Sequence, residues 1–433
     1  MMITINRRRR GAMPKGESMT TGDQRGRADA ASNPVGDGTE WEPTGSLLLT
    51  GISALVTVDE QVGSDELGTI SDGAVVIDEG QIVWVGPAAG APDTDDAIDL
   101  GGRTVLPGWV DSHTHLVFAG DRSAEFAARM AGQDYRASGI LATVEANRET
   151  STDALTDGVR RHLAEFARGG TTTVETKSGY GLTKVDELRS VQAAERAGID
   201  ALTFLGAHVV PPEYADNPDD YVDLVCGPML EAVAPLVQFV DVFCEEGAFD
   251  DAQARRVLSA AERLGLDRKV HGNQLRPGPG VQLAVSMGAT SVDHCTYLTE
   301  ADIDALSAST TVATLLPATD LCTRRGPAPA RELIDAGATV ALASNCNPGS
   351  GYTSSMALVV ALAVIQCRMT VAEAIRAATL GGAQALNRSD IGRIAVGMRA
   401  DLQVLDAPGP DYLAYRPGVP LTAAVWRRGV RVV

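Results

Sequence analysis

Runs of alternating hydrophobic and polar residues lie near both ends of the chain. The segments LLLTGISALVTV and GAVVIDEGQIVWVG occur near the beginning, and the second contains a turn at Asp78, Glu79 and Gly80. The segments IGRIAVGMRADLQVLD and TAAVWRRGVRVV repeat the pattern near the end. A period of two, interrupted by turn residues, predicts β-strands. We therefore expect a small β-sandwich built jointly from residues 46–104 and residues 391–433.

The segment between these ends, residues 105–390, has a different period. Short runs rich in β-branched residues alternate with helix-length stretches rich in Ala, Arg and Glu, which indicates parallel strands joined by helices. The expected strands cover residues 104–110, 171–176, 201–207, 239–244, 269–272, 290–293, 311–316 and 339–343. Eight strands, each followed by a helical connection, predict an α/β fold of the (β/α)8 or TIM-like barrel type.

The first 45 residues differ from the rest of the chain. They are rich in Gly, Arg, Ser, Thr and Asp and have no hydrophobic period. Such a composition cannot bury enough apolar surface to offset the entropy of ordering. We expect residues 1–45 to be a disordered N-terminal extension.

The charge and the cysteines exclude several classes of protein. The formal net charge of −19 disfavours binding to nucleic acid and to anionic membrane surfaces. The longest apolar run, residues 356–365, is too short to cross a bilayer. The six cysteines have no paired spacing, which is typical of reduced thiols in the cytoplasm. We expect a cytoplasmic protein that forms a homodimer.

The histidines are distributed unevenly. Five of the six lie at the ends of expected strands: His113, His115, His208, His271 and His294. Active sites of (β/α)8 barrels form where the strands end, so this clustering predicts a metal or acid–base site. The sixth, His162, falls in a helical stretch, and we interpret it as a packing or surface residue.

The spacing of these histidines suits a metal-activated water. His113 and His115 are two residues apart on a strand and therefore share a face. His271 can approach from across the barrel as a third nitrogen ligand. Three imidazoles leave one position for water, whose pKa the cation lowers towards neutrality. The preceding LPGWVD makes this indication stronger than an HxH motif alone.

Longer motifs extend the pattern beyond the histidines. The chain contains VLPGWVDSHTHLVFAGDR, TTTVETKSGYGL, TFLGAHVVPPEY, VDVFCEEGAF and NPGS. In these segments it resembles the imidazolonepropionases, metal-dependent amidohydrolases, from about residue 46 to the C-terminus. The resemblance implies hydrolysis of 4-imidazolone-5-propanoate to N-formimidoyl-L-glutamate in histidine degradation. It also implies one divalent ion, Zn or Fe, on His113, His115 and His271, with Asn345 at the fourth ligand position.

The resemblance further implies a set of substrate contacts. The matching residues are Arg122, Tyr135, Tyr180, His208, His294, Asn347 and Gly349. Arg122 and the two tyrosines match the grip on the substrate carboxylate, His208 and His294 match groups around the imidazolone ring, and Asn347 and Gly349 line its far side. An arginine also makes independent sense, since guanidinium binds a carboxylate through two parallel hydrogen bonds.

Two positions depart from the family pattern. Asn345 replaces an Asp that usually acts as metal ligand and proton acceptor, and Gln274 replaces a Glu found in many members. An amide oxygen can approach a metal, but an amide cannot accept a proton from water. We therefore assign the proton transfers to His294 and retain Gln274 and Asn345 as catalytic residues. Among the lysines, only Lys177 is a conceivable carbamylated bridge, so we favour one metal ion over two.

Two other functions remain open at this point. The chain could be a related amidohydrolase acting on another small cyclic amide or amidine, because this fold hosts many substrates. A neutral ring would not require Arg122, so the carboxylate contact separates this reading from the first. Alternatively, Asn345 and Gln274 could mark a non-catalytic paralogue, against which the intact set of three histidines argues.

Overall fold

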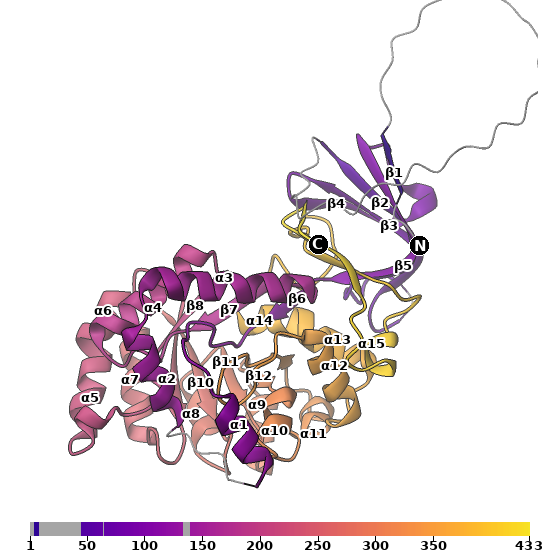
Figure 1. The fold of residues 1–433 in the computed structure, drawn as a ribbon. Coiled ribbons are helices and arrows are strands. Elements are labelled where there is room, and N and C mark those ends of the chain that lie inside the picture. Colours follow the sequence, from indigo (N-terminus) through magenta and orange to yellow (C-terminus); the bar gives the residue numbers. More distant parts are fainter. Residues whose placement is uncertain (1–3, 8–44, 64, 133–138) are drawn as a thin grey trace, which may run out of the picture.

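The computed structural model describes residues 4–7, 45–63, 65–132 and 139–433. The barrel and a smaller β-domain lie side by side, and both chain ends contribute to the β-domain (Figure 1). No helix in these ranges is long and apolar enough to cross a membrane. All six cysteines lie in the described part of the chain and are free thiols.

The β-domain is one curved sheet made by both ends of the chain. Its strands are β1 Thr4–Arg7, β2 Leu47–Val56, β3 Thr69–Asp78, β4 Gln81–Pro87, β5 Asp96–Pro107, β14 Leu402–Leu405, β15 Thr422–Arg427 and β16 Val430–Arg431. β2 and β5 pair in parallel, and the other pairs are antiparallel. Side chains from both ends, including Leu49, Ile82 and Trp426, share one core. The predicted sandwich from both termini is confirmed in this form.

The barrel contains eight parallel strands within the described residues. They are β6 Trp109–Asp111, β7 Thr171–Lys177, β8 Ala201–Ala207, β9 Phe239–Cys244, β10 Asp267–Gly272, β11 Ser291–His294, β12 Val312–Leu315 and β13 Val340–Leu342. They follow one another in chain order, as successive βα units require. Helices surround them (Figure 1). The predicted barrel is confirmed.

The helices fill the connections between the strands. The α-helices are α1 Ser123–Met130, α2 Ile140–Glu149, α3 Thr152–Arg168, α4 Lys184–Ala197, α5 Pro218–Leu224, α6 Leu230–Val233, α7 Asp251–Arg263, α8 Gly280–Ser286, α9 Glu300–Ser307, α10 Pro317–Cys322, α11 Ala330–Asp335, α12 Met356–Ile365, α13 Val371–Arg376, α14 Gly382–Ala385 and α15 Tyr412–Tyr415. Shorter turns are η1 Ala88–Gly90 and η3 Pro212–Tyr214, and π-helical segments are η4 Val225–Met229 and η5 Ala377–Gly381.

The strand expected over residues 104–110 is in fact two strands. Residues 104–107 belong to β5 of the β-domain, where they pair with β14, and the barrel begins with β6. Gly108 separates them, and a Cβ at this position would lie 2.2 Å from the side chain of Thr172. Only glycine lets the backbone cross this closely to β7. The prediction was wrong here because two apolar strands joined without polar residues resemble one.

The N-terminal extension also differs from expectation in part. Residues 4–7, predicted to be disordered, form β1 and pair with residues 96–99 of β5. That stretch of β5 lies beyond the part that β14 covers, and an uncovered strand edge is a template for pairing. The remainder of the predicted extension, residues 1–3 and 8–44, lies outside the described residues.

A buried carboxylate joins the β-domain to the barrel. Asp200, whose side chain is 1% exposed, accepts two hydrogen bonds of 2.9 Å from the Arg427 guanidinium. It also accepts one from the Val174 amide at 3.0 Å. Arg427 additionally donates to the carbonyl of Thr172 at 3.1 Å. One pair of side chains thus ties β15 to β7 and to the start of β8.

We predict that Asp200→Ala lowers the free energy of unfolding by about 3–5 kcal/mol, because it leaves a cation at the domain junction without its buried partner. Chemical denaturation followed by circular dichroism measures the change. Asp157→Ala is the control, since it removes an exposed pair with Arg160 and should cost less than about 1 kcal/mol. Equal effects of the two substitutions would contradict this role of Asp200.

Candidate active site

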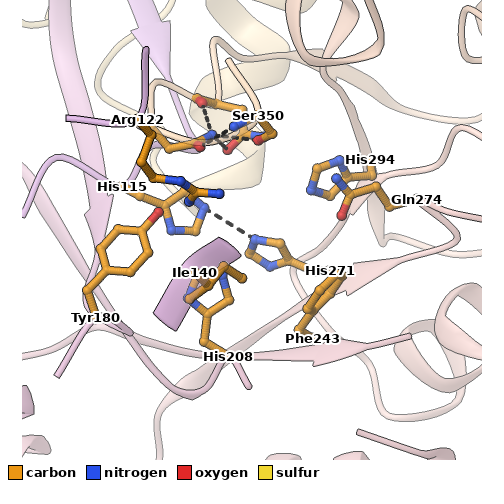
Figure 2. A pocket seen from close by; sticks show the side chains of 12 residues that line it. His115, Arg122, Ile140, Tyr180, His208, Phe243, His271, Gln274, His294 and Ser350 are labelled. Carbon is orange, nitrogen blue, oxygen red and sulfur yellow. Dashed lines mark hydrogen bonds between the residues drawn. The ribbon is translucent and has the colours of Figure 1, made fainter. Parts of the chain in front are cut away.

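A cavity opens where the barrel strands end. The residues that line it are His115, Arg122, Ile140, Tyr180, His208, Phe243, His271, Gln274, His294, Asn345, Asn347 and Ser350 (Figure 2). They come from loops or strand ends of most of the barrel. Nine of them were named from the sequence, and the structure brings these nine together. Ile140, Phe243 and Ser350 were not foreseen, because apolar and hydroxyl residues carry no spacing signal of their own.

The backbone around the first two histidines closes the barrel. The Asn345 backbone amide donates to the His113 carbonyl at 3.0 Å, and the His115 backbone amide donates to the Cys346 carbonyl at 2.9 Å. On the other side, the Lys177 amide donates to the Thr114 carbonyl at 2.9 Å. The segment after β6 is therefore held between the ends of β7 and β13, so both imidazoles are presented from a fixed backbone.

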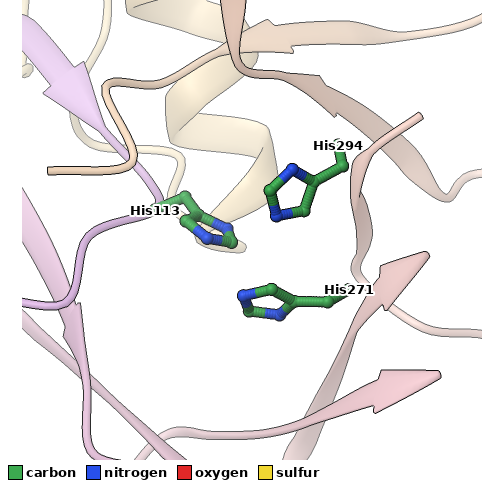
Figure 3. Close-up of side chains that lie close together, drawn as sticks. All are labelled: His113, His271 and His294. Carbon is green, nitrogen blue, oxygen red and sulfur yellow. The ribbon is translucent and has the colours of Figure 1, made fainter. Parts of the chain in front are cut away.

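Four imidazoles converge at the base of the cavity. The Nε2 atoms of His113 and His115 lie 3.3 Å apart, and those of His115 and His271 lie 3.4 Å apart. His294 joins them, because one nitrogen from each of His113, His271 and His294 lies within 4.8 Å of the others (Figure 3). The predicted trio and this second trio share His113 and His271. His162 lies elsewhere, stacked on Phe118, as expected of a packing residue.

The protonation of these rings suits a cation. Burial holds the pKa values of His113 and His115 well below the ordinary value, so both are neutral near pH 7. His113 faces the Asp293 carboxylate through Nδ1 at 2.6 Å, which assigns its proton to Nδ1 and leaves a lone pair on Nε2. Ring nitrogens that face one another across 3.3–3.4 Å, with a lone pair on Nε2 of His113, fit a divalent ion bound by nitrogen ligands.

A layer of buried charges lies behind the histidines. The Lys177 ammonium contacts Glu175 at 2.9 Å, Asp241 at 3.0 Å and Asp293 at 3.7 Å, and all four side chains are fully buried. Asp293 holds His113, and Asp241 lies 3.0 Å from Nδ1 of His271. These residues come from β7, β9 and β11, alternate strands whose inward side chains share a layer of the barrel.

This layer decides the question of a carbamylated lysine. Burial alone would lower the pKa of Lys177, but the three carboxylates around it raise that pKa above its ordinary value. The amine therefore stays protonated and cannot attack carbon dioxide. Burial opposes the ionisation of Asp241, yet His271 and Lys177 lower its pKa overall. The layer contacts His113 and His271, and a protonated Lys177 is not available for carbamylation.

His208 and Tyr180 form one side wall of the cavity. His208 stacks on His115 with ring centroids 5.4 Å apart, and Tyr180 lies 5.3 Å from His208. Burial lowers the pKa of His208 to about 3, so the ring is neutral. Its Nδ1 donates to the Gly179 carbonyl at 3.0 Å, because a carbonyl only accepts. Nε2 of His208 is therefore an acceptor towards the cavity.

Arg122 gives the cavity a cationic side chain. Its Nε and one terminal nitrogen each donate to Glu125 at 2.8 Å, which fixes one edge of the guanidinium. A Cβ at Gly349 would lie 2.3 Å from the other terminal nitrogen, so glycine is needed for the group to lie there. The neighbouring Arg129 donates to the Gly349 carbonyl at 3.0 Å. The guanidinium thus presents its remaining edge to the cavity.

The two departures from the family pattern lie in the same cavity. The amide nitrogen of Asn345 donates to Thr319 Oγ1 at 3.0 Å, and its oxygen accepts from Asn347 at 3.1 Å. The backbone amide of Gln274 donates to Glu245 at 2.9 Å. Glu245 itself lines a different cavity, beside α7, and so cannot replace a missing carboxylate at the histidines.

One predicted residue is not described by the structure, and several residues that support the cavity were not predicted. Tyr135 lies outside the described residues. The supporting roles of Asp241, Glu175 and Glu125 were missed. A signal for the charged layer does exist in the sequence, because Glu175 and Lys177 lie two apart in a strand rich in β-branched residues and must share one of its faces.

Comparison with known proteins agrees with this geometry. Residues 104–430 match the Amidohydrolase family, so the fold and the histidine site define an amidohydrolase. The imidazolonepropionase of Saccharopolyspora erythraea is 61% identical over 391 residues, which cover 89% of this chain and 99% of that protein. That of Mycolicibacterium smegmatis is 56% identical, covering 89% of this chain and 97% of that protein. The chain belongs to the imidazolonepropionase family, which confirms the resemblance seen in the sequence.

More distant solved structures share the fold. A triazine hydrolase from Arthrobacter aurescens superposes with a TM-score of 0.72 at 22% identity, over 90% of this chain and 95% of that one. An adenosine deaminase from Xanthomonas campestris with bound zinc gives a TM-score of 0.67 at 23% identity, over 89% of this chain and 92% of that one. At such identities the likeness concerns the fold alone.

We predict that Asp293→Ala weakens metal retention about 10- to 100-fold, because His113 loses the carboxylate that fixes its tautomer and orientation. Competition with a chelator, followed by elemental analysis, measures the affinity. Asp304→Ala, an exposed change on α9, serves as the control. An unchanged chelator competition in a folded Asp293→Ala protein would show that His113 needs no such support.

Proposed function

We propose that this chain hydrolyses 4-imidazolone-5-propanoate to N-formimidoyl-L-glutamate. One observation carries the proposal: among the described residues, the same cavity is lined by the Arg122 guanidinium, which Glu125 orients, and by a cluster of imidazoles. This arrangement suits a small substrate that has a carboxylate at one end and a hydrolysable ring at the other. A substrate without the acid group would leave the cation without a partner, so a neutral cyclic amide is the weaker candidate.

The side walls would hold the two ends of the substrate. Arg122 would bind the propanoate through the guanidinium edge that Glu125 leaves open, with Tyr180 and Tyr135 beside it. His208 would accept a hydrogen bond from a ring N–H through its bare Nε2. Asn347 and Gly349 would line the far side of the ring. Fixing both ends keeps the ring carbonyl at the histidines.

The histidine cluster would hold one divalent ion, zinc or iron. His113, His115 and His271 are the proposed ligands, with Asn345 at the fourth ligand position. When bound, the ion would supply Lewis acidity to the ring carbonyl and to the attacking water. The neutral His113 and His115 rings and the carboxylates behind His113 and His271 support this assignment, because they combine ring nitrogens in front with negative charge behind.

His294 is the proposed proton carrier. Burial keeps its pKa well below the ordinary value, and its Nδ1 has no hydrogen-bond partner among the described residues. A neutral ring can accept the proton that water loses as its oxygen joins the ring carbonyl carbon. The same ring can return the proton to the nitrogen that leaves when the ring C–N bond breaks. Gln274 would contribute a hydrogen bond to this step but cannot exchange a proton.

The setting of the enzyme is also part of the proposal. We place it in the cytoplasm as a homodimer, as expected from the sequence. Its partner molecule is the small anionic imidazolone, and neither nucleic acid nor a membrane is needed. Turnover of freshly prepared 4-imidazolone-5-propanoate, measured alongside metal content, tests the function directly. No turnover by protein that holds its metal would overturn the proposal.

The substrate's acid group gives a sharper test. Arg122→Met should raise KM for the full substrate about 30- to 150-fold, since a charged hydrogen bond of roughly 2–3 kcal/mol is lost. An analogue that lacks the carboxylate should be affected much less. Arg160→Met is the matched control, because Arg160 forms an exposed ion pair of the same spacing on α3. Equal losses on both substrates would remove Arg122 from carboxylate recognition.

The departure at Asn345 gives a second test. If Asn345 merely replaces a carboxylate, Asn345→Asp should strengthen metal retention and raise kcat by about 10²- to 10⁴-fold, the usual contribution of a general base. The site can accept this change, because the neighbours of the Asn345 side-chain nitrogen are the hydroxyl groups of Thr319 and Ser350. A hydroxyl group can turn to donate to a carboxylate. Metal content and kcat are measured for both proteins in one buffer.

The same measurement on His294→Ala separates two roles for that ring. If His294 carries the proton, the variant should keep its metal and lose turnover. If His294 is a ligand, metal content should fall as well. Wild-type turnover that survives the loss of His294 would contradict both roles. Absence of turnover in wild type and in Asn345→Asp, with added zinc or iron, would favour a non-catalytic paralogue.

A further inference from the structure

A buried carboxylate on α4 holds the loop that carries Tyr180. Glu187 is fully buried, and its Oε1 accepts hydrogen bonds from the amides of Gly181 at 2.8 Å and Leu182 at 2.9 Å. Its Oε2 accepts one from the Gly179 amide at 3.0 Å. Three backbone donors on both sides of Tyr180 therefore converge on one carboxylate. We refer to residues 178–182 as the Tyr180 loop.

The backbone of this loop is one that most sequences avoid. Leu182 has a φ of +56° and Gly179 a φ of +109°. Left-handed backbone is uncommon for a residue with a branched side chain, and it persists where surrounding contacts over-determine it. At Gly179 a Cβ would lie 2.8 Å from the Leu205 carbonyl and 3.0 Å from Nδ1 of His208. The loop is thus pressed against the end of β8, and the carboxylate holds it from the other side.

The same loop fixes two groups of the cavity wall. Tyr180 lines the cavity directly (Figure 2), and the Gly179 carbonyl accepts the Nδ1 hydrogen of His208. Ser178 extends the connection, because its hydroxyl bonds the Glu187 carboxylate and accepts from the Leu205 amide at 3.1 Å. A shift of the loop would move Tyr180 and turn His208 together, although Glu187 itself does not line the cavity.

We propose that Glu187 is a positioning residue for substrate binding, which it controls through the backbone of the Tyr180 loop. The inference rests on the proposed function, since Tyr180 and His208 are its substrate contacts. A carboxylate is required because both of its oxygens face N–H donors. A glutamine in the same place would turn one NH2 group towards an N–H donor and would leave that side of the loop unheld.

The test compares Glu187→Gln, Glu187→Asp and the control Glu195→Gln, which changes an exposed position on the same helix. KM, kcat, metal content and Tm are measured with 4-imidazolone-5-propanoate. Glu187→Gln should raise KM about 10- to 100-fold, the scale on which small displacements of positioned groups act, with a smaller fall in kcat and unchanged metal content. Glu187→Asp keeps the charge but reaches less far, so its KM should be intermediate.

A lower Tm with KM within twofold of wild type would reduce Glu187 to a structural residue and overturn the inference. If Glu187→Gln does not fold, Glu187→Asp carries the same criterion. Calorimetric titration with imidazole-4-propanoate, which has no ring carbonyl to hydrolyse, separates this inference from the activity. Equal affinities of wild type and the folded variant for that ligand would overturn the inference even if turnover is observed. Lack of turnover in wild type, with weaker binding in the variant, would overturn the function alone.

Discussion

The site depends on one buried cation. Lys177 lies among Glu175, Asp241 and Asp293 in the interior of the barrel, and two of these carboxylates contact His113 and His271. Without the ammonium, three carboxylates would remain buried at close range. Removing one partner of a buried pair typically costs about 3–5 kcal/mol, so the loss of any one of these four side chains would strongly destabilise the fold. In return, Asp293 and Asp241 hold the His113 and His271 imidazoles through their Nδ1 atoms.

The geometry of the barrel brings the side chains of this layer together. Alternate strands send their side chains to the same depth, so carboxylates from β7, β9 and β11 meet around one lysine without any loop. The imidazoles lie nearer the strand ends, where the loops that line the cavity begin. The first residue of the Tyr180 loop, Ser178, is bonded to β8, and beyond it the Glu187 carboxylate binds the backbone amides of Gly179, Gly181 and Leu182.

The sequence predicted the parts of this arrangement that leave a local signature. Strand periodicity and the positions of five histidines located the barrel and the face that carries the chemistry. The pairing of Asp293 with His113 could not be predicted, because the two residues are 180 positions apart and only tertiary structure brings them together. The boundary at Gly108 was hidden for a related reason: what separates β5 from β6 is the contact with Thr172, which no local pattern records.

The surroundings of Asn345 suit either an amide or a carboxylate at that position. Its amide takes part in a neutral network with Thr319, Asn347 and Ser350. Hydroxyl groups can reverse their direction, so these neighbours satisfy an amide or a carboxylate with the same heavy-atom positions. The backbone of Asn345 is fixed independently of its side chain, since its amide donates to the His113 carbonyl. Its φ is +50°, a conformation that Asn and Asp both tolerate. The heavy-atom positions around residue 345 therefore suit both asparagine and aspartate. Exchanging one for the other changes the charge of the site and its capacity for proton transfer.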